Sequence, residues 1–193
     1  MSELKRTQLY GVHVAAGATM VDFGGWEMPI KYPTDIVAEH LYTRHFCSLF
    51  DVSHMGRILV DGPQAVPFLQ HELSTNAPAL DVNQAQYAII PNESGGAVDD
   101  AYLYRFEADR YLLVVNAANT DKDLAHLQEQ IKAFDARMTV ITADVAAIAV
   151  QGPKAKELLM ILSGGEQITE PVKNALNTLS FEGRTVRVAK TGY

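Results

Sequence analysis

The stretch NESGGAVDDAYLYRF, residues 92–106, contains the pattern on which the predicted fold depends. After the glycine pair, the residues alternate as in a half-buried strand, whose successive side chains point to opposite faces. One face would carry Asp100, Tyr102, Tyr104 and Phe106. The other would carry Asp99, Ala101, Leu103 and Arg105. The runs AQYAII (85–90) and RYLLVVNA (110–117) flank this strand, and we therefore expect a three-stranded antiparallel meander.

Upstream of the meander, the sequence predicts a helix, a strand and a second helix. The first helix covers residues 34–48, with Thr34 as its N-cap. RILVD (57–61) alternates as a strand, and the following Gly62-Pro63 stops that strand and starts the second helix. The buried stripe of this second helix would consist of Val66, Leu69 and Leu73.

Downstream, Thr120 and Asp123 have the spacing of a capping box, which predicts a helix with Leu124, Leu127 and Ile131 on one face. MTVIT and AAIAV predict strands, and the Gly-Pro pair at 152–153 precedes another helix. Residues 163–174 are polar and predict a loop, whereas 185–193 alternate as a strand.

This mixture of helices and hairpins favours the α+β class, with antiparallel sheets and packed helices. We expect an N-terminal segment with a loop and a helix at residues 1–50 and a main α+β region at residues 51–193. The last strand ends without a closing element, so the chain looks cut off at its C-terminus.

The composition is that of a soluble globular protein: 48% of the 193 residues are hydrophobic and 20% are charged. No apolar run approaches the roughly 18 residues of a membrane helix, and the N-terminus lacks the apolar core of a signal peptide. A net charge of -7 without basic clusters argues against nucleic acid as a partner. The single Cys47 suits a reducing compartment, and the histidine spacing makes a metal site improbable. We expect a cytoplasmic protein without a metal.

The adjacent Asp99 and Asp100 have two interpretations. Strand alternation argues against a carboxylate pair in one pocket, but it places Asp100 on the face of the tyrosines. One acid among aromatic rings suits a flat, nitrogen-rich heterocycle, because the rings stack on it and the carboxylate accepts from N–H groups. Alternatively, both aspartates accept backbone hydrogen bonds from the Gly95-Gly96 turn, and spacing alone favours this structural interpretation.

DVSHMG (51–56) places Asp, Ser and His within six residues and invites a hydrolase interpretation. Neighbouring Ser53 and His54 would point in opposite directions in a strand, and the members of a catalytic triad normally come from distant parts of a chain. The pattern therefore does not favour a hydrolase.

Six segments follow one another along the chain: RTQLY, MVDFGGWEMP, FDVSHMG, GGAVDD, VVNAANTDKD and AVQGPKA. In this order and spacing they resemble the T-protein family of the glycine cleavage system, the tetrahydrofolate-dependent aminomethyltransferases. The terminal TGY resembles the start of the family motif TGYTGE, which lies near the middle of full-length members. The chain thus resembles the N-terminal half of such a protein.

The resemblance implies a transfer in which the lipoyl arm of a partner, the H-protein, delivers an aminomethyl group to tetrahydrofolate. The products would be 5,10-methylenetetrahydrofolate, ammonia and dihydrolipoyl H-protein. By position, Asp100 matches the catalytic carboxylate of the family, and Tyr87 and Tyr104 match aromatic residues of its folate pocket. Asn116 matches a segment close to that pocket. Tetrahydrofolate would be the co-substrate, and no metal is implied.

The glutamate of TGYTGE and a later arginine also bind folate in the family, so the resemblance implies that this chain alone transfers little or no aminomethyl group. Two alternatives stay open. The chain could be a folate-binding relative without transferase chemistry that supports iron–sulfur maintenance, although the retained Asp100 argues against this. It could also be a half-protein that needs a separately encoded C-terminal half. A third relative, a demethylase of N-methyl amines, would be coupled to a flavin domain, and nothing here resembles one.

Overall fold

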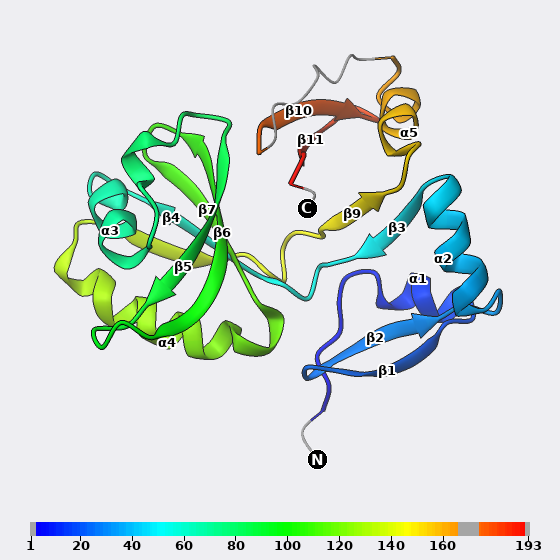
Figure 1. The fold of residues 1–193 in the computed structure, drawn as a ribbon, viewed down its shortest axis with the longest axis horizontal. Coiled ribbons are helices and arrows are strands. Elements are labelled where there is room, and N and C mark those ends of the chain that lie inside the picture. The colour runs from blue at the N-terminus through cyan, green and yellow to red at the C-terminus, as the bar shows by residue number, and fades with distance from the viewer. Residues whose placement is uncertain (1–2, 166–173, 192–193) are drawn as a thin grey trace. The chain divides into compact units, whose positions relative to one another are not determined.

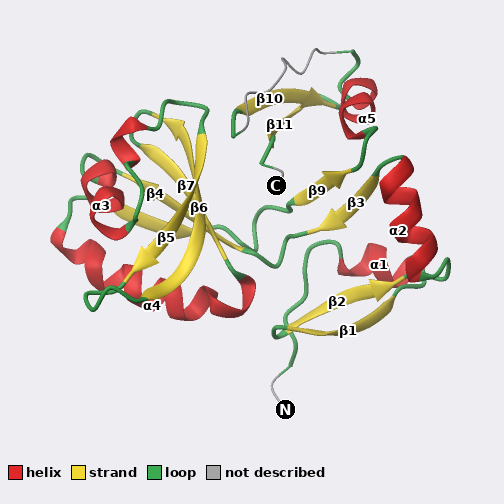
Figure 2. Ribbon diagram, viewed as in Figure 1, coloured by secondary structure: helices red, strands yellow, loops and turns green. Residues whose placement is uncertain are grey.

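The computed structural model describes residues 3–165 and 174–191 (Figures 1 and 2). The described residues group into two compact units. Unit 1 consists of residues 3–54, 142–165 and 179–186, and unit 2 consists of residues 55–141, 174–178 and 187–191. The division at residue 50 that the sequence suggested stays a prediction.

Unit 2 contains a five-stranded antiparallel sheet in the order β5-β6-β7-β4-β8. The strands are β4 (Gly56–Asp61), β5 (Ala85–Pro91), β6 (Ala97–Glu107), β7 (Arg110–Val115) and β8 (Arg137–Val140). The consecutive strands β5, β6 and β7 are neighbours, which confirms the predicted meander. In their register, Tyr87 lies opposite Tyr102, and Leu103 lies opposite Leu113.

Two helices pack on one face of this sheet, α3 (Ala65–Glu72) and α4 (Thr120–Gln130) (Figure 1). Phe68 and Leu69 of α3 and Leu127 of α4 are fully buried with the sheet residues in one hydrophobic core. Each such side chain contributes about 1.5–3 kcal/mol through burial. The buried stripes predicted for both helices are confirmed in the main, with Val66, Leu124 and Ile131 partly buried at the margin of the core. Three short 3₁₀ segments complete the unit: Ala77–Ala79, Ala117–Asn119 and Ile131–Ala133.

The capping box predicted at the start of α4 is not formed. The N-cap is Asn119, whose side chain makes no capping hydrogen bond, and Thr120 is the first helical residue. The Thr120 hydroxyl donates to the backbone oxygen of Asn116 at 3.0 Å. Asp123 does not reach back to the N-cap but is fully buried against the sheet. Asp123 interacts instead with Asp99 of β6, as described below.

Besides parts of a last hairpin, which is described below, unit 1 contains two small antiparallel pairs and three helices. Its elements are α1 (Tyr10–Ala15), β1 (Thr19–Phe23), β2 (Trp26–Lys31), α2 (Ile36–His45), β3 (Ser48–Asp51), β9 (Ile148–Gln151) and α5 (Ala155–Leu162). Strand β1 pairs with β2, and β3 pairs with β9. Gly24 and Gly25 turn the β1–β2 hairpin with φ of 59° and 85°, a conformation that suits glycine. The sequence analysis did not predict the two strands around this turn.

Helix α2 confirms the predicted helix, but its cap differs from the prediction. Asp35, not Thr34, is the N-cap, and its carboxylate accepts a 2.9 Å hydrogen bond from the backbone N–H of Val37. Aspartate satisfies this free N–H at least as well as threonine would. The helix buries none of its residues, and Ile36, Val37 and Leu41 are all at least half exposed.

A last hairpin consists of β10 (Leu176–Phe181) and β11 (Arg184–Ala189). Strand β11 confirms the strand predicted near residue 185, whereas β10 was not predicted. The loop predicted at residues 163–174 lies largely outside the described residues. Ala175 forms an isolated antiparallel bridge with Gln84, the residue before β5, while β10 and β11 form a sheet of their own.

Candidate functional site

The candidate site lies on the face of the sheet that α3 and α4 leave uncovered. Ala101 and Leu103 of β6 point into the core, and the alternate residues Asp100, Tyr102 and Tyr104 point to the opposite face. The alternation predicted for this strand is therefore correct. Tyr87 shares the face because it lies opposite Tyr102 in the neighbouring strand.

The aromatic side chains form a connected surface beside Asp100. The rings of Tyr102 and Tyr104 lie 5.3 Å apart in a tilted arrangement. Tyr87 is 53% exposed, so its ring is accessible to a ligand. Aromatic rings at this spacing offer flat apolar walls against which a heterocycle can stack.

Burial raises the pKa of Tyr104 to about 12, with the charge of Tyr102 adding to the shift and a hydrogen bond with Thr191 acting against it. Its hydroxyl therefore stays protonated at neutral pH. Tyr104 can present a neutral ring and one O–H donor to a ligand, and no negative charge.

Asn116 follows the last residue of β7 and connects the two aspartates. Its amide Nδ2 donates to Asp100 Oδ1 at 2.7 Å and to Asp99 Oδ1 at 3.0 Å. The amide thus uses both of its hydrogens on carboxylates, which fixes its orientation. Strand alternation did not predict this link, because the amide reaches both carboxylates from the neighbouring strand end.

The structural interpretation of the two aspartates is wrong. The turn at Gly95-Gly96 is held by Asn92, whose side-chain oxygen accepts from the backbone N–H of Gly96 at 2.8 Å and of Ser94 at 3.1 Å. An Asn side chain forms such a turn by itself. Asp99 and Asp100 are therefore available for other contacts.

Asp99 lies on the core side, near the start of α4. Burial alone would raise its pKa, but hydrogen bonds from Asp123, from the backbone N–H of Asp100 and from the amides of Asn116 and Asn119 outweigh burial and lower the pKa. The pKa of Asp123 shifts in the opposite direction. Burial, the hydrogen bond to Asp99 and the negative charge of Asp99 together raise the pKa of Asp123 to about 7. The pKa values of the two carboxyl groups thus shift in opposite directions: Asp99 favours the charged form, and Asp123 favours the protonated form.

Sequence reasoning missed the residues that reach the aromatic face from the C-terminal segment. The Tyr102 hydroxyl donates to Asn174 Oδ1 at 2.6 Å. The guanidinium of Arg187 lies 4.3 Å from the ring centre of Phe106, as a cation–π contact. These contacts join residues 72 and 81 positions apart, and no local pattern indicates them. Tyr102 itself was identifiable, because it lies between Asp100 and Tyr104 in the same alternation.

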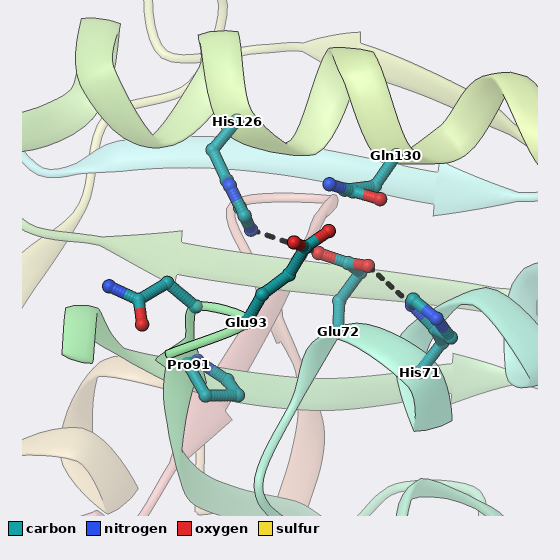
Figure 3. A pocket seen from close by; sticks show the side chains of 7 residues that line it. His71, Glu72, Pro91, Glu93, His126 and Gln130 are labelled. Carbon is teal, nitrogen blue, oxygen red and sulfur yellow. Dashed lines mark hydrogen bonds and ion pairs between the residues drawn. The ribbon is translucent and has the colours of Figure 1, made fainter. Parts of the chain in front are cut away.

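A separate hollow of about 160 Å³ lies between α3, α4 and the end of β5 (Figure 3). Glu72 is 4% exposed there, and its carboxylate contacts His71 Nδ1 at 2.7 Å and His126 Nε2 at 3.1 Å. Figure 3 shows the two histidines approaching Glu72 from either side. None of the four predicted site residues lines this hollow. Across residues 3–165 and 174–191, no group of three or more His, Cys, Asp or Glu could hold a metal ion.

The architecture defines an α+β protein with one helix-covered face of its sheet and one carboxylate-bearing aromatic face. No helix within the described ranges is long and apolar enough to cross a membrane. The family model described as "GCVT N-terminal domain" matches residues 9–193. The chain belongs to this family, and the predicted resemblance to glycine cleavage T-proteins is confirmed.

Curated relatives agree with this assignment. An aminomethyltransferase from Thermus thermophilus is 47% identical over 98% of this chain, and one from Prosthecochloris aestuarii is 44% identical over 98%. The aligned region is 54% and 52% of those two proteins, so the chain spans about half the length of the curated relatives it matches.

Solved structures confirm the fold. The glycine cleavage system aminomethyltransferase T from Bartonella henselae superposes with a TM-score of 0.79 at 36% identity, covering 90% of this chain and 47% of that one. A heterotetrameric sarcosine oxidase from Corynebacterium superposes with a TM-score of 0.62 at 14% identity, a likeness of fold alone.

Proposed function

We propose that this chain provides the Asp100 and aromatic half of a tetrahydrofolate-dependent aminomethyl-transfer site in glycine cleavage. The observation that carries the proposal is one shared face: Asp100, held by Asn116, lies beside Tyr102 and Tyr104, with Tyr87 on the neighbouring strand. The relatives named aminomethyltransferase support it.

In this proposal, the tyrosines bind the pterin ring of the folate by stacking, and Asp100 faces its nitrogen-rich edge. Tetrahydrofolate supplies the nitrogen nucleophiles that accept the one-carbon unit. Cationic, iminium-like character develops on the aminomethyl carbon as its bond to the lipoyl sulfur or to the leaving ammonia breaks. A fixed carboxylate stabilises that charge and can relay a proton at the folate nitrogens.

The lipoyl arm of H-protein is the proposed donor, because the aminomethyl group of glycine cleavage is carried on a thiol. The products are then 5,10-methylenetetrahydrofolate, ammonia and dihydrolipoyl H-protein. H-protein and the reduced folate are therefore the proposed partners, and no metal takes part in the proposed reaction.

Calorimetric titration of the 193-residue chain with a reduced folate tests the binding half of the proposal. We expect saturable binding that Tyr104→Ala abolishes or weakens at least tenfold, because stacking on one aromatic contributes about 1–3 kcal/mol. Tyr42→Ala is the matched control, since Tyr42 is an exposed tyrosine of α2 outside the site. Equal loss in both variants, or binding unaffected by Tyr104→Ala, would place the folate elsewhere.

Asp100→Asn tests the catalytic half, in the protein extended to the full length of its relatives. We expect folate affinity within about tenfold of the unmodified protein and turnover lower by roughly a hundredfold or more. Unchanged turnover would remove Asp100 from the mechanism. Folate binding without any transfer by the unmodified protein would favour the non-catalytic relative.

A second candidate function is that of a half-protein that docks onto a separate C-terminal half. The exposed apolar side chains of α2, Ile36, Val37 and Leu41, favour it, because an exposed apolar patch often marks an interface. Gel filtration of the chain alone tests this candidate, and a cleanly monomeric, non-sticky chain would count against it.

A further inference from the structure

Asp123 is a buried acid that the proposed transfer does not use. It is fully buried on α4, and neither of its oxygens accepts a hydrogen bond from an N–H or O–H donor of the described residues. Asp99 Oδ2 likewise accepts no hydrogen bond from the described residues. Three acceptor oxygens without a donor would be costly in a core. A proton on one of the two carboxyl groups turns this deficit into an O–H···O hydrogen bond.

The proton belongs on Asp123 for a geometric reason. Asp99 accepts the amide of Asn116 at 3.0 Å, a contact that favours a carboxylate. The charged form of Asp123 is less well stabilised. The cation Lys122 Nζ lies 3.8 Å from Asp123 Oδ1, and that amine already donates to the backbone oxygen of Val98 at 2.6 Å. The charged groups that face Asp123 are thus Asp99 and Asp100 of β6 and Lys122 of its own helix.

We infer that Asp123 is a positioning residue, a neutral acid that holds Asp99 so that Asn116 is oriented toward Asp100. Two links of this chain are contacts of the structure: Asn116 donates to Asp99 at 3.0 Å and to Asp100 at 2.7 Å. The inferred link is the proton that Asp123 donates to Asp99, and it agrees with the lowered pKa of Asp99. The catalytic consequence rests on the function proposed for Asp100. The positioning itself can be measured without folate.

The raised pKa of Asp123, about 7, supports this assignment of the proton. Two adjacent carboxyl groups in a buried site ionise in separate steps, so one of them keeps its proton near neutral pH. Carbon-13 NMR of the side-chain carboxyl groups should show one aspartate that titrates near pH 7 in the 193-residue chain. This titration should vanish in Asp123→Asn, and a wild-type chain without it would overturn the shared proton.

Two variants separate positioning from simple packing. Asp123→Asn keeps the shape of the side chain and an N–H donor for Asp99, whereas Asp123→Leu keeps the branched shape, is larger and has no donor. We expect the side-chain amide signals of Asn116 to stay at their wild-type positions in Asp123→Asn. In Asp123→Leu they should move, and their hydrogen exchange should accelerate at least tenfold. Gln128→Leu, at an exposed position of the same helix, is the control.

Unchanged Asn116 signals in a folded Asp123→Leu chain would overturn the inference, and so would equal disturbance by Asp123→Asn. If Asp123→Leu does not fold, the Asn116 signals of Asp123→Asn and the carboxyl titration still test whether Asp123 is protonated and orients Asn116. In the protein extended to the length of its relatives, Asp123→Leu should lower kcat about tenfold at unchanged KM for folate, with rescue by Asp123→Asn. An intact amide network in a protein that transfers nothing would count against the proposed function and leave the positioning role standing.

Discussion

The imidazole Nε2 of His13 lies 3.0 Å from Asp51 Oδ2, and both side chains are almost fully buried. The same carboxylate accepts from the Thr7 hydroxyl at 2.6 Å and, through its other oxygen, from the backbone N–H of Ser53 at 2.8 Å. Asp51 therefore pairs with a histidine 38 positions away and not with His54 of the DVSHMG segment. This buried network ties α1 to the end of β3.

Acid should weaken unit 1 through Asp51. Burial alone would raise the pKa of Asp51, but hydrogen bonds from Ser53, Thr7 and His13 outweigh it and lower the pKa. The folded state then binds the proton less tightly than the unfolded state. The stabilisation is complete above the unfolded pKa of about 3.9 and is lost as the pH falls through the lower folded value.

Asp51→Asn measures this contribution. We expect the variant to be less stable than the wild type by about 1–3 kcal/mol at pH 7, and the difference to shrink below about pH 4. Urea unfolding at both pH values gives the two differences. Asp144→Asn, an exposed position in unit 1, should change neither value, and an equal loss in both variants would argue against the network.

Asp123 should have the opposite effect on stability. Its folded pKa of about 7 lies above the unfolded value, so the folded state binds the extra proton between about pH 4 and pH 7. The free energy of unfolding should therefore fall as the pH rises, by at most about 1.4 kcal/mol per unit from this group. Asp123→Asn should flatten that slope. Parallel stability curves for the two proteins between pH 4 and pH 7 would contradict the raised pKa.

Gly56 should tolerate no side chain. A Cβ added there would lie 2.6 Å from Val115 Cγ2 and 2.6 Å from Thr120 Oγ1, the hydroxyl that donates to the Asn116 backbone. We expect Gly56→Ala to cost about 1–3 kcal/mol and to weaken folate binding, because the turn that carries Asn116 must move. Gly11→Ala is the control: a Cβ in α1 meets nothing within 4 Å and should be neutral or stabilising. Thermal unfolding of both variants measures the difference. Equal melting temperatures for Gly56→Ala and Gly11→Ala would show that the turn accommodates the added Cβ without loss of stability.

The sequence predicted those parts of the fold and the candidate site that depend on local alternation. Strand β6 was recognisable because Ala101 and Leu103 alternate with Asp100 and the tyrosines, and the two faces have opposite environments. The role of Asp123 was not recognisable, because its partner Asp99 is 24 positions away and its spacing imitates a local cap. A local pattern predicts contacts between residues that are close in the sequence, whereas the contacts of a buried acid involve residues that are distant in the sequence.

Tyr102 and Asn174 provide a direct test of how the C-terminal segment is attached to the aromatic face. Their 2.6 Å hydrogen bond joins the centre of β6 to the residue before the Ala175–Gln84 bridge. We expect Tyr102→Phe to lower the free energy of unfolding by about 1 kcal/mol. Asn174→Ala should lower it by more, because alanine is also strained at the φ of 71° that Asn174 adopts. The double variant should lose clearly less than the sum of the two single losses, because both remove the same hydrogen bond. Urea unfolding of the four proteins gives the coupling energy. Strictly additive losses would mean that the two side chains do not depend on each other, and the C-terminal segment would then have to be attached through the backbone bridge and the contact of Arg187 with Phe106.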